Sequence, residues 1–282
     1  MIGWNDSFST FDAPSPYAGA NLEAWSDTAN MLFAAGCEPQ AFALLSSFAA
    51  PLMSLFPTSE GGAVVSIYGG RRSGKSVALT AAATVWAMPA VLDLGRGWLQ
   101  RIAELRHLPV IATALANRDP DVRDRLLTSF IERDDDRQAP EEAEWNTILL
   151  SISGEPLVNP RIVQFDLKVP RGLIAPDKNS PSAMERRLLD NRGIAGQAYL
   201  RALVNHDMVK WCRKMLASKY ALMVDEHGCG LEWRFQMRAI AAAWVAGEIC
   251  VQAKILECSP ERIARWAMGK VLPKRQKSEA AE

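Results

Sequence analysis

The stretch that most restricts the fold is "AVVSIYGGRRSGKSVAL", residues 63–79. Its first six residues are mostly apolar and partly β-branched, which is typical of a strand buried on both faces of a parallel sheet. A glycine-rich turn and the start of a helix follow. Gly69, Gly74, Lys75 and Ser76 match the pattern G-x-x-x-x-G-K-S, and this pattern is meaningful only between a strand and a helix. The sequence therefore predicts a phosphate-binding loop.

Such a loop binds the phosphates of ATP together with Mg²⁺. Its glycines let the main-chain N–H groups face the β-phosphate, and the helix N-terminus adds partial positive charge. Lys75 is predicted to reach the β- and γ-phosphates as a catalytic group, and Ser76 to ligate Mg²⁺. Arg71 and Arg72 either add charge towards the phosphates or a neighbouring chain, or are solvated loop residues. The predicted cofactor-binding residues are Gly69, Gly70, Ser73, Gly74, Lys75, Ser76 and Val77.

Further runs along the chain predict the rest of an α/β core. Buried strands are expected at 107–115, 146–153 and 161–167, in addition to 63–68. Helical spacing is found at 21–35, 38–56 and 75–88, with Gly36 as the stop between the first two. Strands that alternate with helices predict a P-loop NTPase-type parallel sheet flanked by helices.

The chain beyond a loop at 170–181, which is rich in Pro, Gly and polar residues, reads as helix. Three helical pieces are expected at 183–192, 195–224 and 233–256, and a last helix should start with Ser259 as N-cap and Pro260 at its first position. The predicted organisation is an N-terminal arm (1–20), an α/β core (21–168), a C-terminal helical region (182–270) and a polar tail (271–282).

Composition bounds the class of protein. The 282 residues are 49% hydrophobic, which is ample for a core, and 32 Lys and Arg balance 32 Asp and Glu. The chain therefore has no overall positive charge that would indicate a polyanionic partner. Any nucleic-acid surface must be local or supplied by neighbouring subunits.

Five cysteines without a CxxC pair, and no secretory leader before them, predict reduced thiols in the cytoplasm, the host cytoplasm if a phage encodes the chain. The longest apolar run, 239–251, contains Glu248 and is shorter than the roughly 20 residues that a membrane span needs. It is predicted to be a buried helix, and no membrane partner is expected.

The acidic residues that such a site needs for hydrolysis are harder to find in the sequence. P-loop NTPases place a second strand that ends in an Asp, which steadies Mg²⁺, often beside a Glu that polarises the attacking water. The strand best placed here ends in Ala112, Thr113 and Ala114. Asp119 and Asp121 follow several residues later, where capping of a helix is the simpler interpretation.

The string "YALMVDEHG", 220–228, allows two interpretations. It is either a metal-coordinating strand, with Asp225 on the metal and Glu226 in catalysis, or a helix end with exposed acids. His227 and Cys229 lack two further ligands at suitable spacing, which argues against a zinc-type site.

Taken in order, the features from 24 to 268 resemble the P-loop ATPase domain of phage and mobile-element primase-helicases, including a family labelled only as a domain of unknown function. The resemblance rests on "AWSDTANMLFAAGCEPQAFALLSSFAAPLMSLF", "VVSIYGGRRSGKSVALTAAATVW", "RIAELRHLPVIATALANRDPDVRDRLLTSFIE", "WNTILLSISGEPL", "RIVQFDL", "GIAGQAYLRALV" and "EWRFQMRAIAAAWVAGEICVQAKILECSPERIARWAM". It implies a RecA-type or AAA+-type motor that acts on DNA as a ring, with ATP bound between subunits.

The resemblance also assigns residues. It puts Ser153 with Glu155 near the polar sensor at the end of the strand that follows the metal-binding one, and Thr113 with Ala114 where the family has an Asp-Glu pair. In such a motor, a neighbouring subunit supplies an arginine that stabilises the transition state. The candidates are Arg133, Arg137 and Arg161, which are otherwise surface salt-bridge partners.

Three functions are compatible with these features. The chain is a DNA-associated motor or remodelling subunit with weak or lost hydrolysis, a nucleotide-binding structural subunit of a larger oligomer, or a small-molecule kinase, which is disfavoured because no short Arg-rich lid follows the loop.

The stretch 132–145 is acidic and would repel a nucleic-acid backbone or meet a basic neighbour. Basic candidates for DNA contact, or else for a solvated helix face, are Arg186, Arg187, Arg192, Lys210, Arg213 and Lys214.

Overall fold

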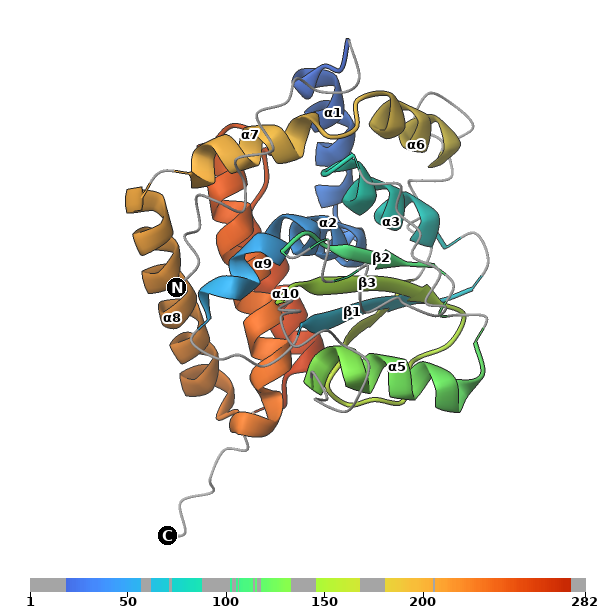
Figure 1. Ribbon diagram of the computed structural model, residues 1–282, viewed down its shortest axis with the longest axis vertical. Coiled ribbons are helices and arrows are strands. Elements are labelled where there is room, and N and C mark those ends of the chain that lie inside the picture. The colour runs from blue at the N-terminus through green and yellow to red at the C-terminus, as the bar shows by residue number, and fades with distance from the viewer. Residues whose placement is uncertain are drawn as a thin grey trace, which may run out of the picture.

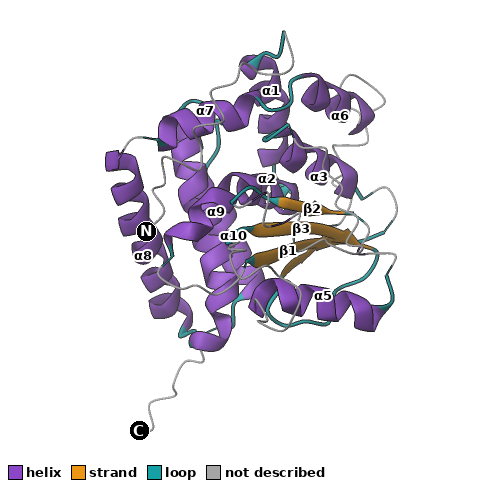
Figure 2. Ribbon diagram, viewed as in Figure 1, coloured by secondary structure: helices purple, strands orange, loops and turns teal. Residues whose placement is uncertain are grey.

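The computed structural model describes residues 19–56, 62–70, 73–87, 107–113, 118–132, 146–167, 181–204 and 206–274, together with Ile102, Leu105 and Leu115. These residues form a four-stranded sheet with helices on both faces (Figure 1, Figure 2). Helix α5 (Pro120–Glu132) lies on one face, and the helices that precede and follow the sheet in the chain gather on the other. The predicted α/β class, a parallel sheet flanked by helices, is confirmed.

The sheet consists of β1 (Ala63–Tyr68), β2 (Val110–Ala112), β3 (Ile148–Ser153) and β4 (Val163–Asp166), in the order β2-β3-β1-β4. All neighbouring pairs are parallel, so the carboxyl ends of the strands meet at one edge. All four predicted strands are present. Strand β2 is shorter than the predicted range because it is an edge strand that pairs with β3 only over its three residues.

Each face of the sheet contributes to its own hydrophobic cluster. Val65 and Phe165 belong to a large cluster with the helices of one face, whereas Val64 and Leu149 join a smaller cluster with Phe130 of α5. Burial on both faces explains why the strands appear in the sequence as nearly continuous apolar runs.

The predicted helical stretches 21–35, 38–56 and 75–88 all contain helices. These are α1 (Leu22–Asn30), η2 (Met31–Phe33), α2 (Glu38–Ala49), η3 (Ala50–Leu55) and, after β1, α3 (Lys75–Thr84). Asn21 caps α1 by accepting a hydrogen bond from the N–H of Ala24 at 3.2 Å. Gly36 has φ of +87°, the left-handed conformation that ends the first helical segment.

The C-terminal helices are α6 (Pro181–Asp190), α7 (Ile194–Leu203), α8 (His206–His227), η5 (Leu231–Trp233), α9 (Arg234–Gln252) and α10 (Pro260–Val271). The stretch 195–224, expected as one helical piece, is divided between α7 and α8. The predicted cap of the last helix is confirmed, because Ser259 Oγ accepts from the N–H of Arg262 at 3.3 Å.

Helices α2 and α9 pack closely in the large cluster, and nearly every residue of both is buried. A Cβ on Gly247 of α9 would lie 2.7 Å from Pro260 Cβ and 3.3 Å from Leu45 Cδ2, so the three helices leave no room for a side chain there. The core and the C-terminal helices thus share one hydrophobic cluster, while the division into 21–168 and 182–270 stays a prediction. Among the described helices, none has the length and apolar character needed to cross a membrane.

Candidate phosphate-binding loop

The predicted loop joins β1 to α3 at the carboxyl edge of the sheet. Strand β1 ends at Tyr68 and α3 begins at Lys75, as the sequence predicts. The edge where parallel strands end is the usual place for ligands in α/β folds. All seven predicted cofactor-binding residues lie in this loop or in the first turn of α3, whereas Arg71 and Arg72 lie outside the described residues.

Two of the loop glycines have conformations or surroundings that a side chain would disturb. Gly69 has φ of +147°, and a Cβ on it would lie 2.7 Å from the carbonyl oxygen of Leu167. The Leu167 N–H donates to Tyr68 O at 2.7 Å, so β4 holds that carbonyl in place. Gly74 has φ of +89°. By contrast, a Cβ on Gly70 would meet nothing within 4 Å.

Helix α3 begins directly after the loop. Its N-cap is Gly74, which has no side chain to cap the first turn, and the first N–H groups of a helix have no acceptors within the helix. This terminus carries partial positive charge, so it suits an anion. The side chain of Ser76 is exposed to solvent, whereas that of Val77 is buried in the core, so Val77 offers a ligand only its main-chain N–H.

The Lys75 side chain lies across the loop. Its Nζ donates to the main-chain carbonyl of Gly69 and to that of Ser153, the latter at 2.7 Å. Ser153 is the last residue of β3 and is paired in register with Tyr68. The amine of Lys75 is therefore held beside both strand ends by main-chain acceptors.

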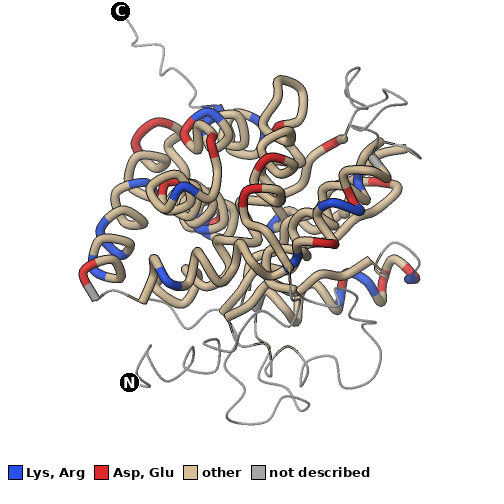
Figure 3. The backbone as a smooth tube through the Cα atoms, turned by 90° about the horizontal axis from the view of Figure 1, so that it is seen from above, with Lys and Arg blue, Asp and Glu red and all other residues tan. Residues whose placement is uncertain are grey.

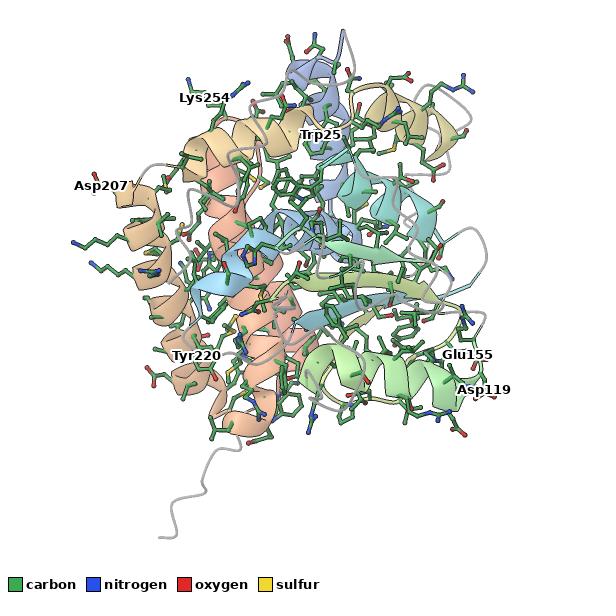
Figure 4. The ribbon with its side chains drawn as sticks, in the orientation of Figure 1. Trp25, Asp119, Glu155, Asp207, Tyr220 and Lys254 are labelled. Atoms are coloured by element: carbon green, nitrogen blue, oxygen red, sulfur yellow. The ribbon has the colours of Figure 1, made fainter. Side chains whose placement is uncertain are left out.

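The expected sensor residues are Ser153, the last residue of β3, and Glu155, which follows two positions later. The Ser153 hydroxyl donates to the carbonyl of Glu155 at 2.5 Å, so it is engaged within its own turn. Glu155 is exposed at the carboxyl edge of the sheet (Figure 4). Ser153 therefore lies beside Lys75, and a sensor role for Ser153 and Glu155 stays a prediction.

The end of β2 lies farther from the loop than the end of β3. Strand β3 separates β2 from β1, so Thr113 is about two strand spacings, roughly 10 Å, from the start of the loop. Ala114 lies outside the described residues. The capping interpretation of Asp119 is confirmed, since its Oδ1 accepts from the N–H groups of Asp121 at 3.0 Å and Val122 at 3.4 Å.

The segment 220–228 is not a strand. It forms the last two turns of α8 and a following glycine, which confirms the helix-end interpretation and makes the strand alternative wrong. An isolated run of four apolar residues fits either structure, and here it packs on α9 rather than pairing with the sheet. Helix α8 lies at the left of Figure 1, whereas Glu155, which follows β3 at the carboxyl edge, lies at the right of Figure 4.

The acids of this segment are therefore distant from the loop of the same chain. Glu226 pairs with Arg265 of α10 at 3.2 Å, and Arg265 also pairs with Glu261 at 2.7 Å. The hydrogen bonds to Glu261 and Glu226 raise the pKa of Arg265. Asp225 is exposed. Among the described residues, no group of three His, Cys, Asp or Glu side chains is placed to hold a metal ion.

The remaining charged candidates are scattered. Arg161 lies over the Phe235 ring, 5.6 Å from its centroid. Arg133, Arg137 and nearly all of the acidic stretch lie outside the described residues. Figure 3 shows basic and acidic residues interspersed over the described helices.

Two residues near the loop were missed by sequence reasoning. Asp166 ends β4, is exposed and is paired in register with Tyr68. Gln40 of α2 is fully buried beside Gly74. The carboxylate of Asp166 could have been noticed at the end of a predicted strand, whereas Gln40 lies in a mostly apolar helix and belongs to no motif.

The five cysteines are free thiols, and four of them are buried. Burial raises the pKa values of Cys212 and Cys258 to about 12. Thiols of this kind are poor nucleophiles at neutral pH, which argues for a structural role in the core.

Comparisons with known proteins agree with this architecture. The fold defines the chain as an α/β domain with a parallel sheet flanked by helices. The family described as "Domain of unknown function (DUF927)" matches residues 17–100, a range that includes the loop. No curated protein matches the sequence.

Solved structures provide the second comparison. One of them, SCCmec type IV Cch, described as an active helicase, superimposes with a TM-score of 0.66 at 14% sequence identity. The similarity covers 92% of this chain and 54% of that one, so the chain spans about half the length of the helicase. At this level of identity the likeness establishes a common fold.

Proposed function

We propose that this chain binds ATP with Mg²⁺ through residues 69–77. The observation that carries the proposal is the pair of glycines with positive φ, Gly69 and Gly74, placed before an uncapped helix whose first residue is Lys75. A side chain at Gly69 would strike a main-chain carbonyl, so the bare backbone is required by the geometry of the loop itself. Such a turn presents N–H groups to an anion.

The loop residues have different roles in this proposal. Gly70, Ser73, Gly74 and Val77 supply main-chain N–H groups, while Lys75 exchanges its carbonyl partners for the β- and γ-phosphates. The exposed hydroxyl of Ser76 holds Mg²⁺, which when bound neutralises charge on the phosphate oxygens.

Hydrolysis is weak or lost in this proposal. Strand β2 is followed by Thr113, which adds neither a negative charge nor a base, so the water-orienting carboxylate of an efficient ATPase is missing from that position. Loss of such a group lowers the rate by about 10²-fold or more. Asp225 and Glu226 lie across the molecule, so a catalytic or metal-binding role for them is restricted to the nucleotide of a neighbouring subunit.

We infer further that the chain is a DNA-associated motor or remodelling subunit of the phage and mobile-element helicase lineage, assembled as a homo-oligomer. The resemblance described from the sequence supports this, and so do the matched residues 17–100 and the common fold with a helicase over 92% of the chain. The ATP of one subunit would then meet an arginine of the next, with Arg161 as the described candidate.

The alternative is a nucleotide-binding structural subunit of a larger assembly. It is favoured by the interspersed charges of the described helices, since a translocating motor needs Lys or Arg gathered where DNA passes (Figure 3). In this case ATP shapes the oligomer and is not turned over.

Binding of a fluorescent ATP analogue tests the first step. The unsubstituted protein should bind it in the presence of Mg²⁺, and Lys75→Ala should abolish binding because the charge facing the phosphates is lost. Lys214→Ala, on the exposed face of α8, is the matched control and should bind normally. Equal affinity of Lys75→Ala and the unsubstituted protein would refute the loop assignment.

Steady-state hydrolysis, measured with and without single-stranded DNA, separates the two functions. A slow rate that DNA increases supports the motor or remodelling subunit, and binding without turnover supports the structural subunit. Brisk turnover would contradict the role given to Thr113, and the double variant Asp225→Ala with Glu226→Ala would then show whether those acids act between subunits.

A further inference from the structure

Helices α2 and α3 lie side by side with their N-termini at the same end. Ser47 Oγ of α2 donates to Ala82 O of α3 at 2.6 Å, and seven residues earlier Gln40 lies against Gly74, where α3 begins. The two helices therefore run parallel, and the first turn of α2 backs the phosphate loop.

The residue at this contact is a buried carboxamide. Gln40 is 0% exposed, and its Nε2 lies 3.6 Å from the position that a Cβ on Gly74 would take. Within the part of the chain that the structure describes, neither its Nε2 nor its Oε1 has a hydrogen-bond partner. A buried polar group without a partner costs about 1–3 kcal/mol, so a carboxamide here is a poor choice for packing alone.

The loop also contains a buried polar group without a hydrogen-bond partner. Ser73 is 3% exposed, and its Oγ also has no partner among the described residues. The two hydroxyls of α2 behave differently, since Ser46 Oγ donates to Phe42 O at 2.8 Å and Ser47 is paired with α3. The unsatisfied groups thus belong to Gln40, which lies against Gly74, and to Ser73, which precedes Gly74 in the chain.

The chemistry of an anion-binding turn explains why donors are needed behind it. When successive N–H groups converge on an anion, the carbonyls of the same residues point away from it, towards the protein. A buried carbonyl requires a donor. Next to Gly74, the side chain of Gln40 has an N–H₂ group that lacks a partner among the described residues.

We propose that Gln40 is a positioning residue for the phosphate loop. With phosphates on the N–H groups of the loop, its Nε2 donates to an outward-facing loop carbonyl next to Gly74, and its Oε1 accepts from the Ser73 hydroxyl. Gln40 thereby holds the binding conformation of the loop from behind and does not touch the nucleotide. The inference rests on the proposed binding of ATP.

The variant Gln40→Met tests this role, because methionine keeps the approximate volume and helix propensity of glutamine and removes both polar groups. The melting temperature should stay equal or rise, since unpaired buried groups are removed. The Kd for the ATP analogue should increase about tenfold or more, the equivalent of about 1.4 kcal/mol or more, because both hydrogen bonds of Gln40 to the loop are lost.

The matched control is Gln236→Met in α9. Gln236 is 2% exposed, nearly as buried as Gln40, and its Oε1 also lacks a partner among the described residues, but its Nε2 donates to Pro160 O at 2.5 Å. This variant should lose stability and keep its affinity for the nucleotide. The opposite pattern in the two variants is the signature of a positioning residue.

Three results overturn the inference. An unchanged Kd in Gln40→Met removes the role of Gln40 alone, whereas failure of the unsubstituted protein to bind the analogue removes the proposed function as well. A fall in affinity that merely parallels a fall in melting temperature, in both variants, indicates a structural role.

A measurement on the unsubstituted protein covers the case in which Gln40→Met does not fold. The side-chain N–H₂ signal of Gln40, assigned by NMR through its contacts to Gly74, should shift and exchange more slowly with ATP and Mg²⁺. An unshifted signal at saturating nucleotide contradicts the proposal.

Discussion

Two adjacent glycines offer a direct test of the loop geometry without any ligand. Gly69→Ala would bring a methyl group 2.7 Å from Leu167 O, about 0.3 Å inside the shortest ordinary contact, at a φ of +147° that L residues rarely adopt. Gly70→Ala meets nothing within 4 Å and has no positive φ. The same chemical change therefore has two opposite expected effects.

The magnitudes follow from these contacts. A non-glycine residue in a sparsely populated backbone region costs about 1–3 kcal/mol, and displacing the end of β4 adds to it, so Gly69→Ala should lose about 3 kcal/mol. For a chain of this size that lowers the melting temperature by about 6–12 °C. Gly70→Ala should gain about 0.4–1 kcal/mol, because alanine reduces the freedom of the unfolded chain.

Thermal and urea unfolding of both variants, followed by circular dichroism, provides the comparison. Gly69→Ala should also lose affinity for the ATP analogue, since the turn before the loop is displaced. Equal melting temperatures of the two variants would show that the main chain at Gly69 relaxes freely and that this loop does not require a bare glycine there.

Two further predictions concern the core. Gly247→Ala should lower the free energy of unfolding by about 1–3 kcal/mol, because its methyl group overpacks against Pro260. Gly269→Ala, with open space around it, should be neutral or stabilising. Chemical denaturation of both variants checks this, and equal stabilities would contradict it. The thiols of Cys212, which is buried, and of Cys258, which is partly buried, should react slowly with a thiol reagent at pH 8, because burial raises their pKa values to about 12. Since the unfolded thiols lose their protons first, stability should fall as pH rises above about 9, and rapid labelling of the folded protein would refute the burial of these groups.

Much of the fold was predictable because its signals are local. Strand β1 has the predicted bounds, and β3 and β4 lie within the predicted ranges, since strands buried on both faces leave unbroken apolar runs. Gly36 and Ser259 marked a helix end and a helix start for reasons of backbone conformation and capping. Edge strand β2 was overestimated because hydrophobicity alone does not reveal how far a strand is paired.

The candidate site was only half predictable. The loop residues are contiguous, so one motif names them all. The segment at 220–228 has the composition of a strand followed by two acids, and its helical structure depends on packing against α9. Gln40 precedes Gly74 by 34 positions, and no pattern in either segment indicates that they touch.

The sequence by itself determined the glycine-rich turn between β1 and α3, the alternation of strands and helices and the absence of a carboxylate at Thr113, because these depend on residue type and on spacing between near neighbours. Only the tertiary structure decided that β3 lies between β2 and β1, that Lys75 spans to Ser153 and that Gln40 backs the loop. The reason is that such contacts join distant segments, and they are selected by the summed packing of the whole core rather than by any local preference.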